Sequence, residues 1–187
     1  MTSRIAALDR ALCSYGPATV AERVALTRMR DIVAEAQATH AEAALSREQY
    51  APGHFTASAF VLSPTGDQLL LIYHSKLRRW LQPGGHVDTD DEDLLATAVR
   101  EVAEEVGLSH LCTEAPGIFD IDIHRIPARA DAPEHEHFDV RFALRSQTLR
   151  IQAGSDASAC RWVTMAELRT LDSDESVLRA ARKLFSE

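Results

Sequence analysis

Three glutamates crowd one turn of a predicted helix, and this arrangement constrains the chain more than any other feature of its sequence. Residues 91–106 have the apolar spacing of a helix. Successive helical residues turn by about 100°, so Glu101, Glu104 and Glu105 fall within an arc of roughly 100°. The apolar side chains of the same helix point in a separate direction, toward an expected core: Leu95, Val99, Val102 and Val106.

Helix stability alone does not favour this acidic turn. Like charges spaced three or four residues apart repel each other by roughly 0.2–0.5 kcal/mol per exposed pair. A bound hard cation would remove the repulsion, because Mg²⁺ prefers oxygen ligands. The alternative is a solvated helix face, since eight carboxylates and a single base, Arg100, lie between Asp88 and Glu105. The spacing of the three glutamates favours the metal site.

The residues around the acidic turn agree with a metal or phosphate site. Arg100 precedes Glu104 by four residues and can pair with its carboxylate. Gly107 is placed to end the helix. Gly84 and Gly85 come before the helix, where a glycine turn lets main-chain groups approach a phosphate or a metal closely.

The segment resembles the Nudix box, G-x5-E-x7-R-E-U-x-E-E-x-G-U, in which U is a bulky aliphatic residue. The second half matches at every specified position: Arg100, Glu101, Val102, Glu104, Glu105, Gly107 and Leu108. The first half differs by one extra residue after Gly85, so Asp91 or Glu92 could fill its first acidic position.

The resemblance implies a Mg²⁺-dependent hydrolase, with Mn²⁺ as a substitute ion. By position in the box, Glu101, Glu104 and Glu105 would be metal ligands, and the Gly85 carbonyl could complete a metal shell. Arg100, Glu104 and Glu105 would be the catalytic residues, with Arg100 orienting the glutamates. The general base stays open between Glu104 and an acid on a later loop. The expected reaction is the attack of water on phosphorus in a nucleoside diphosphate, or related diphosphate, linked to another group.

Other polar residues are weaker candidates for substrate binding. His86 follows the glycines, and Arg79 belongs to a basic stretch with Lys76 and Arg78; each could instead be a solvated or loop-capping residue. Trp80 could stack on a base, although packing is the more common role of such a residue.

The alternation of a later predicted strand also suggests a polar face. His137, Asp139 and Arg141 share one face, with His124 expected opposite; the face could line a substrate cleft or simply meet solvent. His135 and His137 share a strand face as well, which permits a second metal site but does not by itself predict one.

Strands mixed with helices indicate an α+β fold. The resemblance specifies a Nudix-type α/β/α sandwich with a mixed β-sheet. Residues 1–50 are predicted to form a helical extension, in which a short helix precedes Tyr15-Gly16-Pro17 and a longer one follows to about His40. The longer helix carries an expected apolar stripe: Val20, Val24, Met29, Ile32 and Val33. Residues 51–187 are predicted to form the Nudix domain.

That domain is expected to hold five strands and, besides the box helix, two short helices. A hairpin of strands 54–62 and 68–74 is followed by strands at 117–126, 137–144 and 160–163, and by helices near 165–171 and 175–185.

Composition limits the partners. The chain has 187 residues and a net charge of −8, which disfavours binding to nucleic acid but suits a small phosphorylated substrate, in particular a nucleotide derivative, held through a cation. No apolar run is long enough for a membrane span, and the N-terminus lacks a signal-peptide core, so a cytoplasmic location is expected. Three scattered cysteines predict free thiols. A homodimer is an option at the level of the family.

Two alternatives to a small-molecule hydrolase stay open. The first is a non-catalytic nucleotide-binding or regulatory module with the same fold, although such proteins usually lack some of the glutamates. RNA decapping falls within the hydrolase class, where the acidic composition makes it a minor option. The second alternative is an isomerase. An isomerase on this fold would need a cysteine near its substrate, and no cysteine lies in or beside the box.

Overall fold

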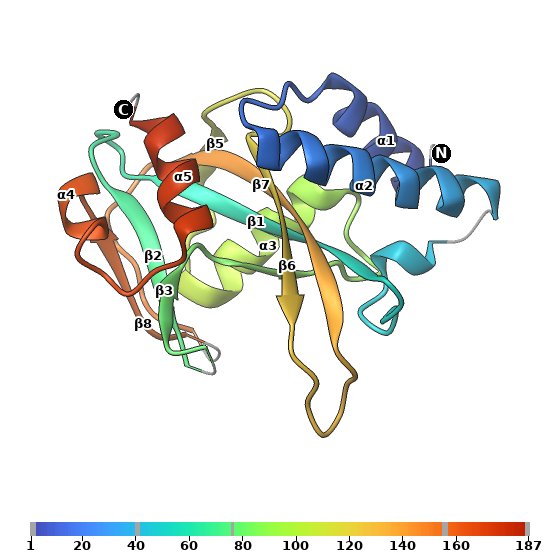
Figure 1. Cartoon of the computed structure of the whole chain (residues 1–187). Coiled ribbons are helices and arrows are strands. Elements are labelled where there is room, and N and C mark those ends of the chain that lie inside the picture. The colour runs from blue at the N-terminus through green and yellow to red at the C-terminus, as the bar shows by residue number, and fades with distance from the viewer. Residues whose placement is uncertain (1–2, 40–41, 76, 155–156, 186–187) are drawn as a thin grey trace. The chain divides into compact units, whose positions relative to one another are not determined.

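The chain forms an α+β structure (Figure 1). Its residues group into two compact units. The computed structural model describes residues 3–39, 42–75, 77–154 and 157–185. The two units are built from these segments: Met1–Ala57, Gly85–Thr97 and Gly117–Arg141 in unit 1, and Ser58–Gly84, Ala98–Pro116 and Phe142–Glu187 in unit 2. Strands β1 and β7 and helix α3 run from one unit into the other.

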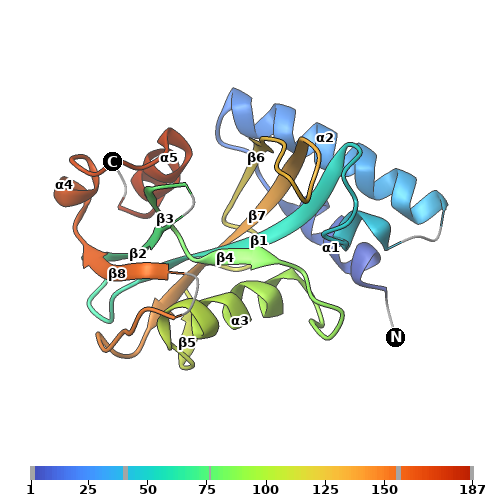
Figure 2. The ribbon, with the colours of Figure 1, turned by 90° about the horizontal axis from the view of Figure 1, so that it is seen from below.

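Unit 1 begins with the two predicted helices, α1 (Arg4–Ser14) and α2 (Val20–Ala38), and a 3₁₀ turn, η1 (Ala43–Leu45). Each helix starts where a hydroxyl satisfies a free backbone N–H: Ser3 Oγ accepts from Ala6 N, and Thr19 Oγ1 accepts from Glu22 N. The two helices lie side by side, and α2 packs against β6 (Figures 1 and 2).

The apolar stripe expected on α2 is partly wrong. Val20 and Val24 are 67% and 58% exposed, and the buried face consists of Glu22, Ala25, Met29, Val33 and Ala36. Glu22 is fully buried because its carboxylate accepts hydrogen bonds from the Tyr15 hydroxyl, the Ala18 N–H and the Thr19 hydroxyl. These bonds offset the cost of burying the charge, and the sequence pattern alone does not reveal them.

Unit 1 also holds β6 (Asp120–Ile126) and the first part of β7 (His135–Ser146), together with the start of β1 (Gly53–Leu62). Strands β6 and β7 are antiparallel, with Ile123 opposite Phe138 and His124 opposite His137. The predicted strands at 117–126 and 137–144 are confirmed with shifted ends.

Unit 2 contains the predicted hairpin, in which β1 pairs antiparallel with β2 (Leu69–His74). Strand β2 also pairs antiparallel with β3 (Arg79–Leu81) and with β8 (Ala157–Val163), and Figure 2 shows these strands together. Strand β5 (Leu111–Thr113), which was not predicted, pairs with the end of β7. Short strands of this kind carry too few residues for a clear alternation.

The helix that carries the box, α3 (Leu94–Val106), starts three residues later than predicted. Asp93 explains the difference, because its side chain accepts from Ala96 N and its carbonyl from Thr97 N, as at a helix N-terminus. The buried apolar residues are Leu94, Ala98, Val102 and Val106. The expectation that Leu95 and Val99 face the core is therefore wrong, since both are only half-buried.

The chain closes with α4 (Met165–Leu168), begun by a capping box between Thr164 and Glu167, and α5 (Glu175–Leu184). The three cysteines are free thiols, as predicted. Among the described helices, none is long and apolar enough to cross a membrane.

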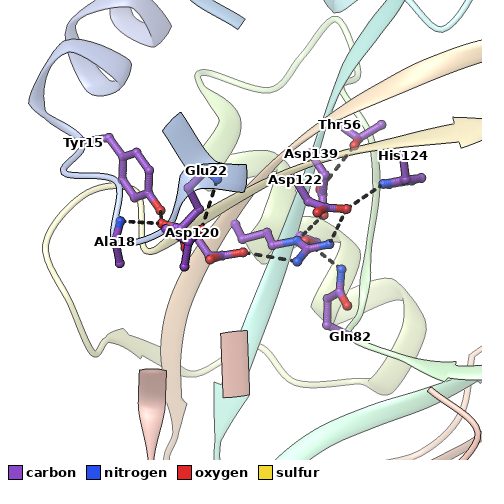
Figure 3. A network of polar contacts seen from close by, with 12 residues as sticks. Tyr15, Ala18, Glu22, Thr56, Gln82, Asp120, Asp122, His124 and Asp139 are labelled. Carbon is purple, nitrogen blue, oxygen red and sulfur yellow. Dashed lines mark hydrogen bonds and ion pairs between the residues drawn. The ribbon is translucent and has the colours of Figure 1, made fainter. Parts of the chain in front are cut away.

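A buried arginine holds the strands of unit 1 together. Arg141 is 2% exposed and faces three carboxylates: Asp139 at 2.8 Å, Asp120 at 3.2 Å and Asp122 at 3.3 Å. Asp139 accepts a further hydrogen bond from the Thr56 hydroxyl of β1 (Figure 3). The acidic partners raise the pKa of Arg141 against the opposing effect of burial. One cation therefore links both strands of the β6–β7 pair.

Substitution Arg141→Met should destabilise the protein by about 3–5 kcal/mol, because it leaves buried carboxylates without their cation. The matched control is Arg125→Met on β6, whose pair with Glu134 spans 3.6 Å and is exposed, so its cost should be at most about 1 kcal/mol. Urea unfolding of the two variants and the wild type measures the difference. Equal free energies of unfolding for both variants would contradict this role of Arg141.

Candidate functional site

The second half of α3, in unit 2, brings the predicted acidic residues onto one turn. Arg100 Nη1 lies 2.9 Å from Glu101 Oε1 and 3.3 Å from Glu104 Oε2, so a single guanidinium orients two carboxylates. The Glu101 side chain is 15% exposed, whereas that of Glu104 is 58% exposed. The Arg100–Glu104 pair expected from the spacing is present, and the contact with Glu101 adds to it.

Glu105 is held from β4 (Gly84–His86), a short strand that stands where a glycine turn was expected. Its side chain is buried, and Oε2 accepts a hydrogen bond of 3.0 Å from the Gly84 N–H. A hydrogen bond from a main-chain donor to a carboxylate fixes the direction of that carboxylate. Gly84, the first residue of β4, therefore positions a glutamate of the box. Gly85 belongs to unit 1, and its expected role as a carbonyl ligand stays a prediction.

Sequence reasoning missed Gly154, which supports the same turn of α3. Its N–H donates to the Glu105 carbonyl at 2.7 Å, and a Cβ at this position would lie 2.0 Å from the Glu104 carbonyl oxygen. Only a residue without a side chain permits this approach. No signal near residue 154 points to it, because its partner is about 50 residues earlier in the chain.

The donor set of this turn fits a hard divalent cation. Three carboxylates offer only oxygen atoms, which is the ligand type that Mg²⁺ and Mn²⁺ share. Arg100 binds the carboxylates of Glu101 and Glu104, and the Gly84 N–H binds that of Glu105. The Glu104 side chain is exposed to solvent. Glu101, Glu104 and Glu105 are thus the residues that could hold such an ion.

The two candidates for the first acidic position of the box have different surroundings in unit 1. Asp91 is buried, and its Oδ2 accepts from the Asp88 N–H at 2.9 Å and from the Thr97 hydroxyl at 2.8 Å. Glu92 is exposed. Asp91 is therefore the residue that shapes the loop before α3.

The basic stretch and the tryptophan lie in unit 2. Arg79 is exposed and pairs with Asp174, while Lys76 lies outside the described residues. Trp80 packs edge-on against Tyr73, with the Arg161 guanidinium 4.8 Å from the centre of its ring. These contacts agree with the packing role expected for Trp80.

The polar face predicted on β7 exists and forms a ladder with β6 in unit 1. Asp120 lies opposite Arg141, Asp122 opposite Asp139, and His124 opposite His137. His124 Nδ1 is 3.5 Å from Asp122 Oδ2, and the side chain is 42% exposed. Of the two carboxylate oxygens of Asp139, one accepts from Thr56 and the other from Arg141. The face is more buried than an ordinary solvent-facing strand.

Histidines gather beside this ladder. The rings of His54 and His137 are 4.7 Å apart, and His86 lies 5.1 Å from His54 and 5.2 Å from His137, all measured between ring centres. Burial, followed by the neighbouring histidines, lowers the pKa of His137 to about 2; burial, followed by His54, lowers the pKa of His86 to about 4. Both rings are thus neutral near pH 7. The sequence did not single out His54.

A family model, described as the NUDIX domain, matches residues 52–184. The chain belongs to the Nudix family. This match confirms the resemblance that the box suggested, and the α+β fold with a mixed sheet agrees with solved Nudix structures. The boundary predicted at residue 50 remains a prediction. Helix α2, in the predicted extension, packs against β6, which lies within the matched residues.

A curated relative is the zebrafish (Danio rerio) protein "m7GpppN-mRNA hydrolase NUDT17", which is 31% identical over 135 residues. The alignment covers 64% of this chain and 44% of that relative, so the chain spans less than half of its length.

Two solved structures show the same fold. A NUDIX-family hydrolase from Clostridium perfringens has 24% identity and a TM-score of 0.55, with 70% of this chain and 95% of that chain covered. The NUDIX domain of Shewanella oneidensis NrtR, solved with ADP ribose, has 19% identity and a TM-score of 0.52, with 80% and 96% covered.

Acidification should destabilise the metal-free Nudix domain through His137. Its folded-state pKa of about 2 lies below the ordinary value of about 6.5, so the unfolded chain takes up the proton first. Stability is therefore full above about pH 6.5 and falls with decreasing pH, by at most about 1.4 kcal/mol per pH unit for this residue.

The measurement is urea unfolding of chelator-treated protein between about pH 7 and pH 5. His137→Gln should flatten the pH dependence, whereas His110→Gln, at an exposed histidine, should leave it as in the wild type. If the unfolding free energies of the wild type and His137→Gln change with pH in parallel, His137 is not the source of the pH dependence.

Substitution Gly154→Ala should displace the acidic turn of α3, because its methyl group meets the Glu104 carbonyl. We expect a loss of about 1–3 kcal/mol in unfolding free energy and weaker Mg²⁺ binding. Gly16→Ala is the control, since a Cβ there has no atom within 4 Å. Thermal unfolding and Mg²⁺ titration calorimetry provide the two measurements, and unchanged values for Gly154→Ala would refute the close approach.

Proposed function

We propose that this Nudix domain is a Mg²⁺-dependent hydrolase, with Mn²⁺ as a substitute ion, that cleaves a phosphoanhydride bond in a nucleoside diphosphate linked to another group. The observation that carries the proposal is the acidic turn of α3, in which Arg100 orients Glu101 and Glu104 while the Gly84 N–H fixes Glu105. An arrangement of oxygen donors held this firmly is suited to an ion that contacts phosphate.

The residues have separate roles in the proposed reaction. Glu101, Glu104 and Glu105 hold the cation, and Gly85 adds its carbonyl. Arg100 keeps two of the carboxylates in one orientation. When bound, Mg²⁺ supplies positive charge that stabilises the phosphate oxygens and lowers the pKa of the attacking water.

The proton of the attacking water needs an acceptor. Glu104 is one candidate, because its side chain is the most exposed of the three and reaches solvent. An acid on a later loop is the other. A pH profile of kcat for Glu104→Gln separates them, since loss of the acidic limb assigns the base to Glu104.

Four residues are proposed to contact the substrate. Arg79 and His124 are exposed and carry N–H donors suited to phosphate oxygens. His86 is half-buried and neutral, so one ring N–H can donate. Asp139 would have to use lone pairs beyond those taken by Thr56 and Arg141.

The substrate is proposed to be a nucleotide derivative of low molecular weight. The zebrafish relative is named as a hydrolase of capped mRNA, which contains a phosphoanhydride next to a nucleoside. The net charge of −8 disfavours a long polynucleotide, because phosphate binding needs a basic surface. A cap dinucleotide therefore fits better than a capped RNA. A homodimer and a cytoplasmic location complete the proposal.

The test is product release from a panel of nucleoside triphosphates, nucleotide sugars, ADP-ribose, NADH, dinucleoside polyphosphates and a cap dinucleotide, with Mg²⁺ or with EDTA. Glu104→Gln and Glu105→Gln should each lower kcat/KM by at least about 100-fold, because each removes a charged ligand. Glu35→Gln, an exposed helical glutamate of α2, is the matched control and should retain wild-type activity.

The outcomes discriminate between the two functional classes. Turnover that requires Mg²⁺ and collapses in both box variants supports the hydrolase and names its substrate class. Binding of a panel member without turnover supports the non-catalytic module. Equal activity of the wild type and both box variants would overturn the assignment of the site.

A further inference from the structure

Three histidines of unit 1 converge although they come from two distant parts of the chain. His54 lies near the start of β1, and His135 and His137 lie on one face at the start of β7. Nitrogen atoms of all three rings lie within 4.8 Å of one another. We propose that His54, His135 and His137 form a second metal site, which binds a divalent transition-metal ion such as Zn²⁺.

The tautomers of two of the rings are fixed by main-chain carbonyls. His54 Nδ1 lies 3.0 Å from the Gln49 carbonyl oxygen, and His135 Nδ1 lies 2.8 Å from the Pro133 carbonyl oxygen. A carbonyl only accepts, so each Nδ1 carries the proton and each Nε2 presents a lone pair. Metal-binding histidines commonly have this second hydrogen bond, because it orients the ring and raises its basicity as a ligand.

The lone pairs aimed at the site have no other use among the described residues. His54 Nε2 and His137 Nε2 are buried and have no hydrogen-bond partner there. His54 as a whole is 1% exposed. Leaving a buried polar atom unpaired costs about 1–3 kcal/mol, so these two atoms, on rings whose centres are 4.7 Å apart, favour a partner that accepts both lone pairs. A metal ion is such a partner, whereas one further hydrogen-bond donor would satisfy only one of them.

The chemistry of the site differs from that of the acidic turn. Imidazole nitrogen suits Zn²⁺ and neighbouring transition metals, whereas Mg²⁺ prefers oxygen. Three histidines leave a fourth position open in a tetrahedral site, as in zinc sites that take water or an anionic ligand. A Zn–N distance of about 2.0–2.1 Å places the nitrogens about 3.3 Å apart, so the rings must close by at most about 1.5 Å.

Other aromatic rings lie close to the three proposed ligands. His86 lies 5.1 Å from His54 and 5.2 Å from His137 between ring centres, and His124 lies 5.3 Å from His137. Tyr50 packs edge-on against His135 at 5.1 Å and limits the movement of that ring. The three proposed ligands thus lie at the centre of a wider group of aromatic nitrogen donors.

The experiment uses the full chain after removal of metal with a chelator. Co²⁺ is added as the spectroscopic probe, in the presence of excess Mg²⁺ to occupy the carboxylates of α3. We expect one equivalent to bind with the strong visible bands of four-coordinate Co²⁺, and Zn²⁺ to abolish these bands by displacement. Absence of saturable binding, or only the weak bands of a six-coordinate oxygen site, would overturn the proposal.

Variants then identify the ligands. His135→Gln and His137→Gln should each weaken Co²⁺ binding by at least about 100-fold, because each removes one of three ligands. His110→Gln is the matched control at an exposed histidine, and Glu101→Gln tests the acidic turn; both should bind Co²⁺ as the wild type does. Loss of binding in Glu101→Gln, with retention in both histidine variants, would assign the ion to α3 instead.

A measurement on the wild type removes any dependence on how the variants fold. The Nδ1–H protons of His54 and His135 should give paramagnetically shifted, exchangeable proton signals in the Co²⁺ complex, because their rings would be bonded to the ion. Co²⁺ bound without such signals would refute histidine ligation.

Discussion

The acidic turn of α3 depends on the contacts that offset the repulsion among its three glutamates. Arg100 neutralises part of the charge of Glu101 and Glu104, and the Gly84 N–H binds Glu105, which is buried. These contacts fix the directions of the carboxylates but leave more negative than positive charge on the turn. A divalent cation would supply the missing positive charge. The contacts that reduce the repulsion among the glutamates therefore also orient their carboxylates for metal binding.

A different solution to buried charge operates along β6 and β7. Arg141 carries one positive charge among three aspartates, and the register of the two strands places these residues in alternate cross-strand pairs, on one face. The next pair on that face consists of His124 and His137. Ionic pairing thus gives way to the neutral ring of His137 along a single polar face, because burial lowers the pKa of this histidine to about 2.

The sequence predicted the features that depend on local spacing. The hairpin of β1 and β2, the two N-terminal helices, the box helix and the shared face of His137, Asp139 and Arg141 all follow from periodicity and turn residues. The family could be predicted because its signature is contiguous.

What the sequence could not predict depends on partners that are distant in the chain. Val20 and Val24 suggested a buried stripe, but both are exposed. Glu22 lies on the buried face instead, because Tyr15 and the turn before α2 satisfy its carboxylate. Gly154 had no significance until the fold brought it against α3. The substrate remains outside sequence reasoning, since the candidate contacts are scattered and have other roles available to them.

His54 illustrates the same limit for metal chemistry, and it also indicates why two kinds of donor occur in this chain. Spacing reveals His135 and His137 but not the third ring, which comes from a strand about 80 residues earlier. Hard carboxylate oxygens on α3 and imidazole nitrogens beside β7 prefer different ions. An all-oxygen site for a readily exchanged ion and a histidine site for a tightly held one would then serve separate purposes, the first in contact with phosphate and the second in fixing the ends of β1 and β7 together.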